Sequence, residues 1–400
     1  MAKYTKATPI NNKHNINLVK SNDNIYQYSL QNMKSSELNG REFFLSSPTL
    51  SDFHHEDIKK FPLVLLFHGG GEEAYSKNGS GILNYSQFMN INCFCLSFKG
   101  QPSNNGLSWE NAYPWLKSNP KNDVLFVKTV LKIILKDDGL LNKYLDVSQI
   151  FASGKSDGGG FCVLLQKEFP MTNVTRFTNS LKGDYETVDI KIKKVAICSG
   201  AHFVLNSSKN KKKIPKLSEG TSLLEIHGTG DTIMPFKGEY YRNKEAIKDA
   251  EYWKKVDSSL KNTYTYNIEF LYEQIAKQNN FNGKQEQSKS WNNSTVTSYR
   301  KDRSGDMVYL VKVPNQDHTW QGHPNSGPDS NKGSNKYFDA TICILDFFGI
   351  IDKYPVTKLL KKQYTSYMYD YKPYSSETLI KQVESLIKNN KLHKNFQKLF

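Results

Sequence analysis

The sequence predicts an α/β protein whose mostly parallel, doubly wound sheet carries helices on both faces. The first observation is the unbroken apolar run at residues 63–67, typical of a strand buried on both faces of a parallel sheet. The second is the segment 123–135, where apolar residues recur at helical spacing. The third is the repeated alternation of such segments along the chain, which is the pattern of β-α-β units.

The individual elements follow from the same patterns. Strands are predicted at residues 41–46, 63–67, 93–98, 149–153, 195–199, 222–227 and 308–313. Helices are predicted at residues 123–135, 158–169 and 341–348, the second of which begins in glycines and ends before Pro170. The long connection 237–304 is expected to contain a helix around Tyr252 and Trp253 and a loop over 279–294.

We expect one main domain over residues 38–350 with an extension at each end. Residues 1–37 are polar and without periodicity, which predicts a flexible or loosely docked arm. Residues 351–400 are rich in Tyr and Lys and contain a predicted amphipathic helix, with Ser376 as its N-cap. Its apolar stripe consists of Leu379, Ile380, Val383, Leu386 and Ile387. This helix either docks on its own domain or contacts a partner protein or an acidic surface.

The strong positive charge does not by itself indicate nucleic-acid binding. The formal net charge is +15, but only five of the 54 basic residues are arginines. Lysine is a strongly hydrated point charge and lacks the bidentate fork with which arginine recognises phosphate. The sequence contains no known nucleic-acid-binding motif. We therefore expect most of this charge to lie on a solvated surface, and we expect no nucleic-acid partner.

The cysteines and the N-terminus predict an intracellular, soluble protein. The odd number of five cysteines and their apolar neighbours indicate free, buried thiols, at Cys93, Cys95, Cys162, Cys198 and Cys343. The N-terminal residues contain no apolar core of a signal peptide, and no apolar run is long enough to span a bilayer. Unconventional export or packaging in a particle stays open.

A Gly-x-Ser-x-Gly motif at 154–158 follows the strand predicted at 149–153. This arrangement is typical of a nucleophile exposed on a sharp turn between a strand and a helix, where the neighbouring residues must be small. Ser156 is therefore the candidate nucleophile. The alternative, a phosphate-binding P-loop, requires a glycine five positions before Gly154, where the chain has Gln149.

A serine hydroxyl needs a base, and the base needs a carboxylate to fix its tautomer. Asp231 follows the strand predicted at 222–227, and His318 follows the strand predicted at 308–313. Both therefore lie at the carboxyl end of the sheet, where sites form in α/β proteins. Asp317 is the competing carboxylate, but we favour Asp231 because Asp317 is the direct neighbour of His318 in sequence. His323 is the alternative base.

The glycines after the strand at 63–67 predict an oxyanion hole. We assign its donors to the backbone N–H groups of Gly70 and of Asp157, the residue after the candidate nucleophile. Gly69 or Gly71 could replace Gly70, and a plain tight turn is the alternative reading. No Cys/His cluster has the spacing of metal ligands, so neither a metal nor an organic cofactor is expected.

With these residues, the chain resembles the polyhydroxybutyrate depolymerase and feruloyl esterase family of α/β-hydrolases over about residues 41–348. The matching segments are 62–69 at the oxyanion strand, 123–127 before the elbow strand, 227–236 around the acid, 318–320 at the histidine, and the tryptophan pair Trp109 and Trp115. The chain departs from the family pattern at Ser108, Asp317 and Gln321, where the family has Cys, Gly and Pro.

The resemblance implies a serine esterase with a Ser156, Asp231 and His318 triad that acts through an acyl-enzyme intermediate. It implies short acyl, hydroxyacyl or hydroxycinnamoyl esters, either small or attached to a polymer. Trp109, Trp115 and Trp320 are candidates for substrate binding, with core packing as the equally weighted alternative. The competing hypothesis is an inactive hydrolase-fold protein that binds partners through its basic surface or its C-terminal tail.

Overall fold

The computed structural model of the 400-residue chain describes the greater part of the predicted main domain. The described residues are 10, 15–22, 25–48, 60–76, 81–85, 93–103, 106–109, 121–179, 183–204, 214–238, 264–281, 283–288, 294–300, 307–321 and 340–350. The predicted helix around Tyr252 and Trp253 and the C-terminal extension 351–400 lie outside these residues.

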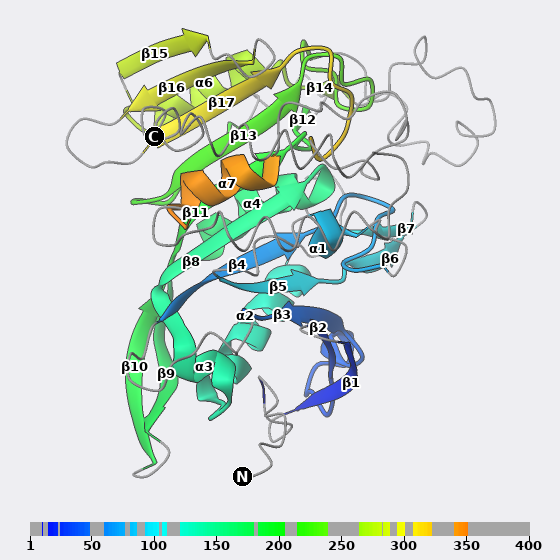
Figure 1. Cartoon of the computed structure of the whole chain (residues 1–400), viewed down its shortest axis with the longest axis vertical. Helices are drawn as coiled ribbons and strands as arrows, with labels where there is room; N and C mark the ends of the chain where they lie inside the picture. The colour runs from blue at the N-terminus through cyan, green and yellow to red at the C-terminus, as the bar shows by residue number, and fades with distance from the viewer. Residues whose placement is uncertain are drawn as a thin grey trace, which may run out of the picture.

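An eleven-stranded sheet forms the centre of the molecule, in the order β1-β2-β3-β5-β4-β8-β11-β13-β17-β16-β15 (Figure 1). Six neighbouring strands in its middle are parallel: β5 (Phe94–Phe98), β4 (Phe61–Phe67), β8 (Leu145–Lys155), β11 (Ile192–Cys198), β13 (Ser222–Gly228) and β17 (Met307–Val313). The strands beyond both ends of this block are antiparallel, beginning with β3 (Glu42–Ser46) and β16 (Thr295–Arg300). All seven predicted strands are therefore present.

Helices cover both faces of the sheet, and each face has its own buried apolar cluster. One cluster joins the sheet to α2 (Lys121–Lys136), α4 (Asp157–Leu165) and α6 (Ile268–Gln278). The other joins the opposite face to α1 (Ile82–Tyr85) and α7 (Ala340–Phe348). Strand order, parallel centre and two covered faces confirm the predicted α/β-hydrolase fold.

The order of the strands also locates the functional edge. The chain places β5 on one side of β4 and then returns to place β8 on the other side. Where the winding of a doubly wound sheet reverses in this way, the loops leave the carboxyl ends of the two strands in opposite directions and form a crevice. The segments after β4 and β8 contain the predicted oxyanion loop and the predicted nucleophile.

The predicted N-terminal arm is wrong for residues 16–30. Strands β1 (Ile16–Asn22) and β2 (Ile25–Leu30) form an antiparallel hairpin that extends the sheet through β3. Tyr26, Tyr28 and Leu30 alternate along β2 and are buried, and the Tyr28 ring stacks on Phe43 with 5.4 Å between ring centroids. This short alternation within an Asn-rich sequence is the signal that the sequence interpretation missed.

Several further elements were not predicted. A hairpin of β9 (Met171–Asn179) and β10 (Asp184–Ile190) extends away from the central sheet at the lower end of the molecule in Figure 1. Strand β15 (Gly283–Ser288) lies within the expected loop 279–294, which corrects that prediction. Both β10 and β15 are polar strands at the edge of a sheet, so neither shows the apolar pattern of a buried strand.

The remaining elements are short. They are a 3-10 turn at Ser36–Leu38, α3 (Leu140–Tyr144), a 3-10 turn at Gln166–Glu168, and the strand pairs β6 (Gln101–Ser103) with β7 (Gly106–Ser108) and β12 (Phe203–Val204) with β14 (Tyr264–Thr265). The predicted helix 158–169 thus ends in a 3-10 turn before Pro170.

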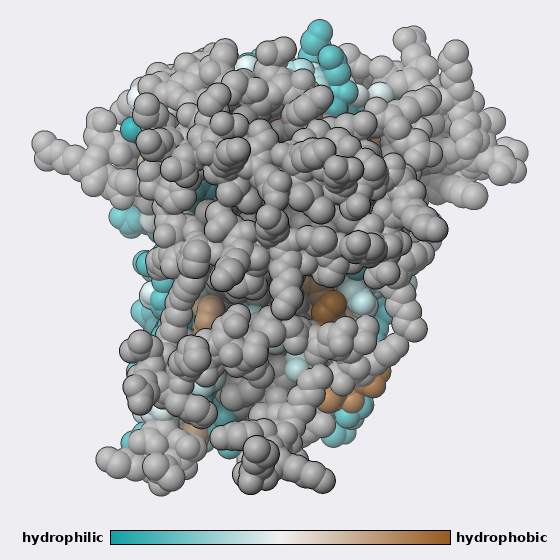
Figure 2. All heavy atoms as spheres, in the orientation of Figure 1, coloured by the Kyte–Doolittle hydropathy of each residue, from teal (hydrophilic) through white to brown (hydrophobic). Residues whose placement is uncertain are grey.

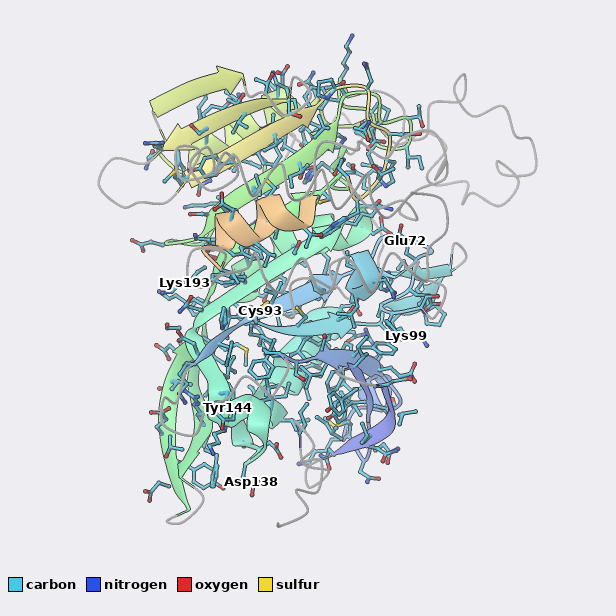
Figure 3. The ribbon with its side chains drawn as sticks, viewed as in Figure 1. Glu72, Cys93, Lys99, Asp138, Tyr144 and Lys193 are labelled. Carbon is cyan, nitrogen blue, oxygen red and sulfur yellow. The ribbon has the colours of Figure 1, made fainter. Side chains whose placement is uncertain are left out.

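The described surface and the thiols match the expectations from composition. All five cysteines are free and buried, including Cys93, which is labelled in Figure 3. The described residues visible in Figure 2 are mainly hydrophilic, with small and separate hydrophobic areas. No helix in the described part of the chain combines the length and the apolar character needed to cross a membrane.

A buried ion pair ties the antiparallel side of the sheet to α2. Arg41 Nη2 lies 2.7 Å from Asp123 Oδ1, and the two side chains are only 6% and 0% exposed. The guanidinium also lies 4.2 Å from the centroid of the Phe126 ring. Removing one member of such a pair leaves an uncompensated buried charge, which is far more costly than the loss of a surface pair.

We therefore predict that Asp123→Ala lowers the free energy of unfolding by about 3–5 kcal/mol. The exposed pair Lys277–Glu273 is the matched control, and Glu273→Ala should change stability by about 0.5 kcal/mol or less. Urea unfolding followed by circular dichroism measures both. Equal losses in the two variants would contradict the importance of burial.

Candidate active site

Ser156 has the backbone of a nucleophile elbow. It stands between β8 and α4 with φ 52° and ψ −117°, a region that residues other than glycine rarely occupy. Its N–H donates to the carbonyl oxygen of Cys198 at 3.0 Å, and its own carbonyl accepts from Gly160 and Ala201. These hydrogen bonds hold the turn in its strained conformation.

Close packing explains the glycines on both sides of Ser156. A Cβ on Gly154 would overlap the Gly158 carbonyl, and a Cβ on Gly158 would overlap the carbonyl of Phe67 on β4. In both cases the obstructing atoms belong to the backbone, which cannot move away as a flexible side chain could. The small residues therefore allow α4 to start directly against the ends of β4 and β8.

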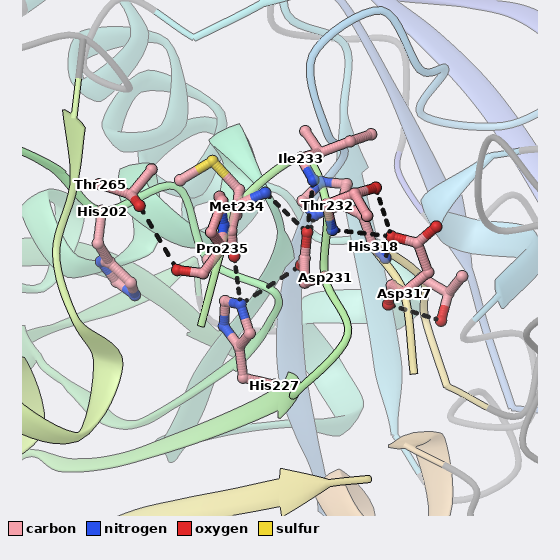
Figure 4. Close-up of polar contacts among 12 residues, drawn as sticks. His202, His227, Asp231, Thr232, Ile233, Met234, Pro235, Thr265, Asp317 and His318 are labelled. Atoms are coloured by element: carbon pink, nitrogen blue, oxygen red, sulfur yellow. Dashed lines mark hydrogen bonds and ion pairs between the residues drawn. The ribbon is translucent and has the colours of Figure 1, made fainter. Parts of the chain in front are cut away.

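The structure brings His318 and Asp231 together at the carboxyl edge of the sheet (Figure 4). His318 Nδ1 lies 2.9 Å from Asp231 Oδ2, and both side chains are buried. The other carboxylate oxygen, Oδ1, accepts from the N–H groups of Ile233 at 3.0 Å and Met234 at 2.7 Å. Burial alone would raise the pKa of Asp231, but the charge of His318 and the hydrogen bonds from His318 and His227 outweigh it and lower the pKa.

Asp317, the competing carboxylate, has a local role. Its Oδ1 accepts from the backbone N–H of His318 at 2.7 Å and from the N–H and hydroxyl of Thr232 at 3.1 and 3.0 Å. These bonds join the loop after β17 to the loop after β13. The contact with the His318 ring is made by Asp231, so the geometry favours Asp231 as the orienting group. The alternative base, His323, lies outside the described residues.

Ser156 and His318 approach the same region from different strands. Among the described residues, no hydrogen bond joins the Ser156 hydroxyl to the His318 imidazole. Glu72 lies near both. Its Oε2 accepts from Gly69 N–H, and a Cβ on Gly69 would lie 3.3 Å from the Ser156 Cβ, while the charge of His318 acts on the Glu72 carboxylate. Because such hydrogen bonds often form only when substrate binds, the missing bond does not contradict a role for His318 as base.

The glycine loop after β4 offers Gly70 as the oxyanion donor. Gly69 N–H donates to Glu72 Oε2 at 3.0 Å, and Gly71 N–H donates to the Leu107 carbonyl at 2.7 Å. Both alternatives to Gly70 are therefore engaged. A Cβ on Gly70 would lie 3.1 Å from the Asp157 side-chain carboxyl carbon, which places Gly70 beside the first residue of α4.

Hydrogen bonds of His68 and Trp109 stabilise this loop. His68 is buried, with Nδ1 donating to the Gly69 carbonyl at 2.7 Å and Nε2 accepting from Gly100 N–H at 2.9 Å. The Gly100 donor requires the neutral ring, and burial lowers the pKa of His68 accordingly. Trp109 Nε1 donates to the His68 carbonyl at 2.8 Å. These contacts give the loop a fixed shape.

For two of the candidate substrate-binding tryptophans, the structure favours the equally weighted alternative of core packing. Trp109 is 0% exposed and stacks on Phe161 with 5.0 Å between ring centroids. Trp320 is 1% exposed and donates from Nε1 to Thr341 Oγ1 at 2.9 Å. Both indoles are enclosed by core side chains, so packing is their role here. Trp115, the third candidate, lies outside the described residues.

A partly buried ion pair beside Ser156 was not predicted. Lys155, the last residue of β8, is 2% exposed and forms an ion pair with Glu72, labelled in Figure 3. Burial alone would raise the pKa of Glu72, but the charge and hydrogen bond of Lys155 and the hydrogen bond from Gly69 outweigh it and lower the pKa. A lysine directly before Ser156, at the buried end of a strand, was the available sequence signal. Within the described residues, no group of His, Cys, Asp or Glu side chains is arranged to hold a metal ion.

Comparisons with known proteins find only distant structural likenesses. No family model and no curated protein matches the sequence. A thermophilic esterase from Thermogutta terrifontis with bound propionate is 14% identical, with a TM-score of 0.42 over 80% of this chain and 92% of that one. A truncated carbohydrate esterase from gut microbiota is 13% identical, with a TM-score of 0.39 over 80% and 92% of the two chains.

An acylaminoacyl peptidase from Pyrococcus horikoshii is also similar. It is 12% identical, with a TM-score of 0.40 over 80% of this chain and 42% of that chain. The α/β-hydrolase fold of this chain is seen in its own strand order and connectivity.

The elbow geometry predicts that Gly158→Ala destabilises the protein. The added methyl group would meet the backbone of Phe67, and we expect a loss on the order of 3 kcal/mol or more. The control is Gly283→Ala in β15, where the nearest atom to the new Cβ is 3.9 Å away. Because glycine weakens a strand interior, this control should be neutral or slightly stabilising. Thermal unfolding of both variants tests the prediction, and a Gly158→Ala protein as stable as wild type would contradict the packing described.

Proposed function

We propose that the protein is a serine hydrolase that cleaves carboxylic esters through an acyl-enzyme intermediate. The observation that carries this proposal is the combination of a strained Ser156 elbow with the buried Asp231–His318 pair at the same edge of the sheet. A positive φ at a serine is costly, and such strain persists at sites where it serves a function. The pair supplies the base and the fixed tautomer that a serine nucleophile requires.

In the proposed reaction, Ser156 Oγ attacks the ester carbonyl while His318 Nε2 accepts its proton. Asp231 accepts from His318 Nδ1–H, which leaves Nε2 as the unprotonated nitrogen and stabilises the imidazolium that forms. The N–H groups of Gly70 and Asp157 bind the developing oxyanion. His318 then gives its proton to the leaving alcohol, and water repeats the sequence to release the acid. No step requires a metal or an organic cofactor.

We propose short acyl, hydroxyacyl or hydroxycinnamoyl esters as the substrate class, either as small molecules or attached to a polymer. This finer assignment is supported by the resemblance of the sequence segments around the oxyanion loop, the acid and the histidine to polyhydroxybutyrate depolymerases and feruloyl esterases. The burial of Trp109 and Trp320 removes two of the three aromatic residues suggested for an aromatic acyl pocket. A screen with acetyl, butyryl, hydroxybutyryl and feruloyl esters distinguishes these groups.

The competing function is a hydrolase-fold protein without activity that binds partners through its basic surface or its tail. The tail lies outside the described residues. The cost of the Ser156 backbone and of a buried Asp231 argues against this alternative, because a binding scaffold needs neither.

A fluorophosphonate probe should label the wild-type protein covalently and leave Ser156→Ala unlabelled. The probe reacts only with a serine activated by an adjacent base. Ser153, a buried serine three residues earlier on β8, provides the control. Ser153→Ala should label like wild type. Intact-protein mass spectrometry measures the adduct. Equal labelling of wild type and Ser156→Ala would exclude Ser156 as the nucleophile.

Asp231→Asn should reduce the turnover of p-nitrophenyl acetate by on the order of a thousand-fold or more, because the amide donates to His318 and favours the wrong tautomer. Asp317→Asn is the matched control, since it changes the neighbouring carboxylate without touching the imidazole. It should retain most of the activity. The reverse order of effects would assign the orienting role to Asp317.

A further inference from the structure

A second histidine lies directly behind the proposed catalytic carboxylate. His227 is 0% exposed at the end of β13, four residues before Asp231. Its Nδ1 lies 2.8 Å from Glu225 Oε1. Its Nε2 lies 2.8 Å from the Met234 carbonyl oxygen and 3.3 Å from Asp231 Oδ2 (Figure 4). Both ring nitrogens therefore face oxygen acceptors, and the Phe236 ring lies 5.8 Å from the imidazole between centroids.

The contacts of Nε2 fix a proton on that nitrogen. A backbone carbonyl such as that of Met234 can only accept, and Asp231 Oδ2 already accepts from His318. An unprotonated Nε2 would place a lone pair against a carbonyl and a carboxylate in a site without solvent, which is strongly unfavourable.

The contacts of Glu225 fix a proton on the other nitrogen. Glu225 is 0% exposed, and its Oε1 accepts from Gly200 N–H at 2.8 Å as well as facing His227. Its Oε2 accepts from the Tyr272 hydroxyl at 2.8 Å and faces His202 Nε2 at 3.2 Å. This many donors stabilise the carboxylate form, so His227 Nδ1 must donate to it.

The pKa directions agree with this proton count. Burial alone would lower the pKa of His227, but the hydrogen bonds and charges of Asp231 and Glu225 raise it to about 10. Burial would raise the pKa of Glu225, but the hydrogen bonds from His202 and His227 lower it to about 2.

We propose that His227 is a positioning residue that carries a proton on both ring nitrogens at neutral pH and, together with Glu225, holds the Asp231 carboxylate in the orientation that meets His318. This inference rests on the proposed function, because it assigns a role within the proposed triad. His227 does not touch the reacting atoms and acts through Asp231.

Charge balance explains why a cation beside Asp231 does not weaken the proposed triad. His227 alone would cancel the negative charge that Asp231 needs to stabilise an imidazolium on His318. Glu225 returns that charge, so the buried trio of Glu225, His227 and Asp231 carries one net negative charge. Asp231 thereby gains a neighbouring donor and keeps its electrostatic effect on His318.

The two-residue spacing of Glu225 and His227 along β13 brings this trio together. Alternate residues of a strand face the same side of a sheet, so Glu225 and His227 share the face of β13 that α6 covers. Tyr272 reaches Glu225 from α6, and the turn after β13 brings Asp231 back to His227. The motif at 227–231 thus contains the acid and its positioning residue.

The protonation state is measured directly by ¹⁵N NMR of the full chain with labelled histidines. At about pH 9 an ordinary imidazole is neutral, since its pKa is about 6.5. One of the nine histidines should nevertheless show two protonated ring nitrogens, and this signal should disappear only as the pH rises through about 10. His227→Gln should remove it. A folded wild-type protein with no imidazolium at about pH 9 would overturn the proposal, whether or not the variant folds.

The positioning role is tested by kinetics with a matched pair of variants. His227→Gln should lower kcat by about 10-fold to 100-fold, with KM little changed. This is the range found when the hydrogen-bond partners of metal-bound histidines are mutated. His202→Gln removes a contact with the same Glu225 but none with Asp231, and its kcat should stay close to wild type. Equal losses in both variants would mean a purely structural role and would overturn the proposal.

Failure of this inference is distinguishable from failure of the proposed function. A wild-type protein that is not labelled by fluorophosphonate would contradict the hydrolase proposal, whereas the NMR signal reports the His227 proton independently of activity. A labelled wild type without the imidazolium would leave the hydrolase standing and remove only the positioning role.

Discussion

The buried carboxylate of Asp231 is the constraint on which the functional edge depends. It is held by two backbone N–H groups on one oxygen and by two histidines at the other. An ionised carboxylate away from water is stable only when its acceptor sites are filled in this way. The loops after β13 and β17 are consequently shaped around one charge, and the position of the His318 ring follows from it.

A second constraint acts on the opposite side of the proposed catalytic region. The start of α4 is pressed against β4 and β8 so closely that only glycine fits at 154 and 158. This packing forces the strained conformation of Ser156 and brings the glycine loop after β4 next to Asp157. Lys155 at the end of β8 and Glu72 in the loop after β4 then join the two strand ends by a partly buried ion pair. Close backbone packing therefore fixes Ser156, and a fully hydrogen-bonded Asp231 carboxylate fixes His318.

The sequence predicted the central sheet because its strands contain apolar segments of the kind that a parallel sheet buries on both faces, most clearly at 63–67. It also identified Ser156, Asp231 and His318, since each follows a predicted strand within a recognisable local motif, and the structure brings the last two into contact. The catalytic roles of these residues stay a proposal. The polar strands β10 and β15 and the N-terminal hairpin were missed because edge strands depend on hydrogen bonds to a neighbour more than on apolar pattern. The pairing of Lys155 with Glu72 joins residues far apart in sequence, which no local pattern specifies.

The central claim is that Ser156 is activated by the Asp231–His318 pair, and a crystal structure of the protein after reaction with a phosphonate ester tests it most directly. The account predicts a phosphorus atom bonded to Ser156 Oγ, a phosphonyl oxygen within hydrogen-bond distance of the Gly70 and Asp157 N–H groups, and His318 Nε2 facing the Ser156 oxygen. A phosphonate attached to another residue, or a His318 ring that stays out of reach of the adduct, would contradict it.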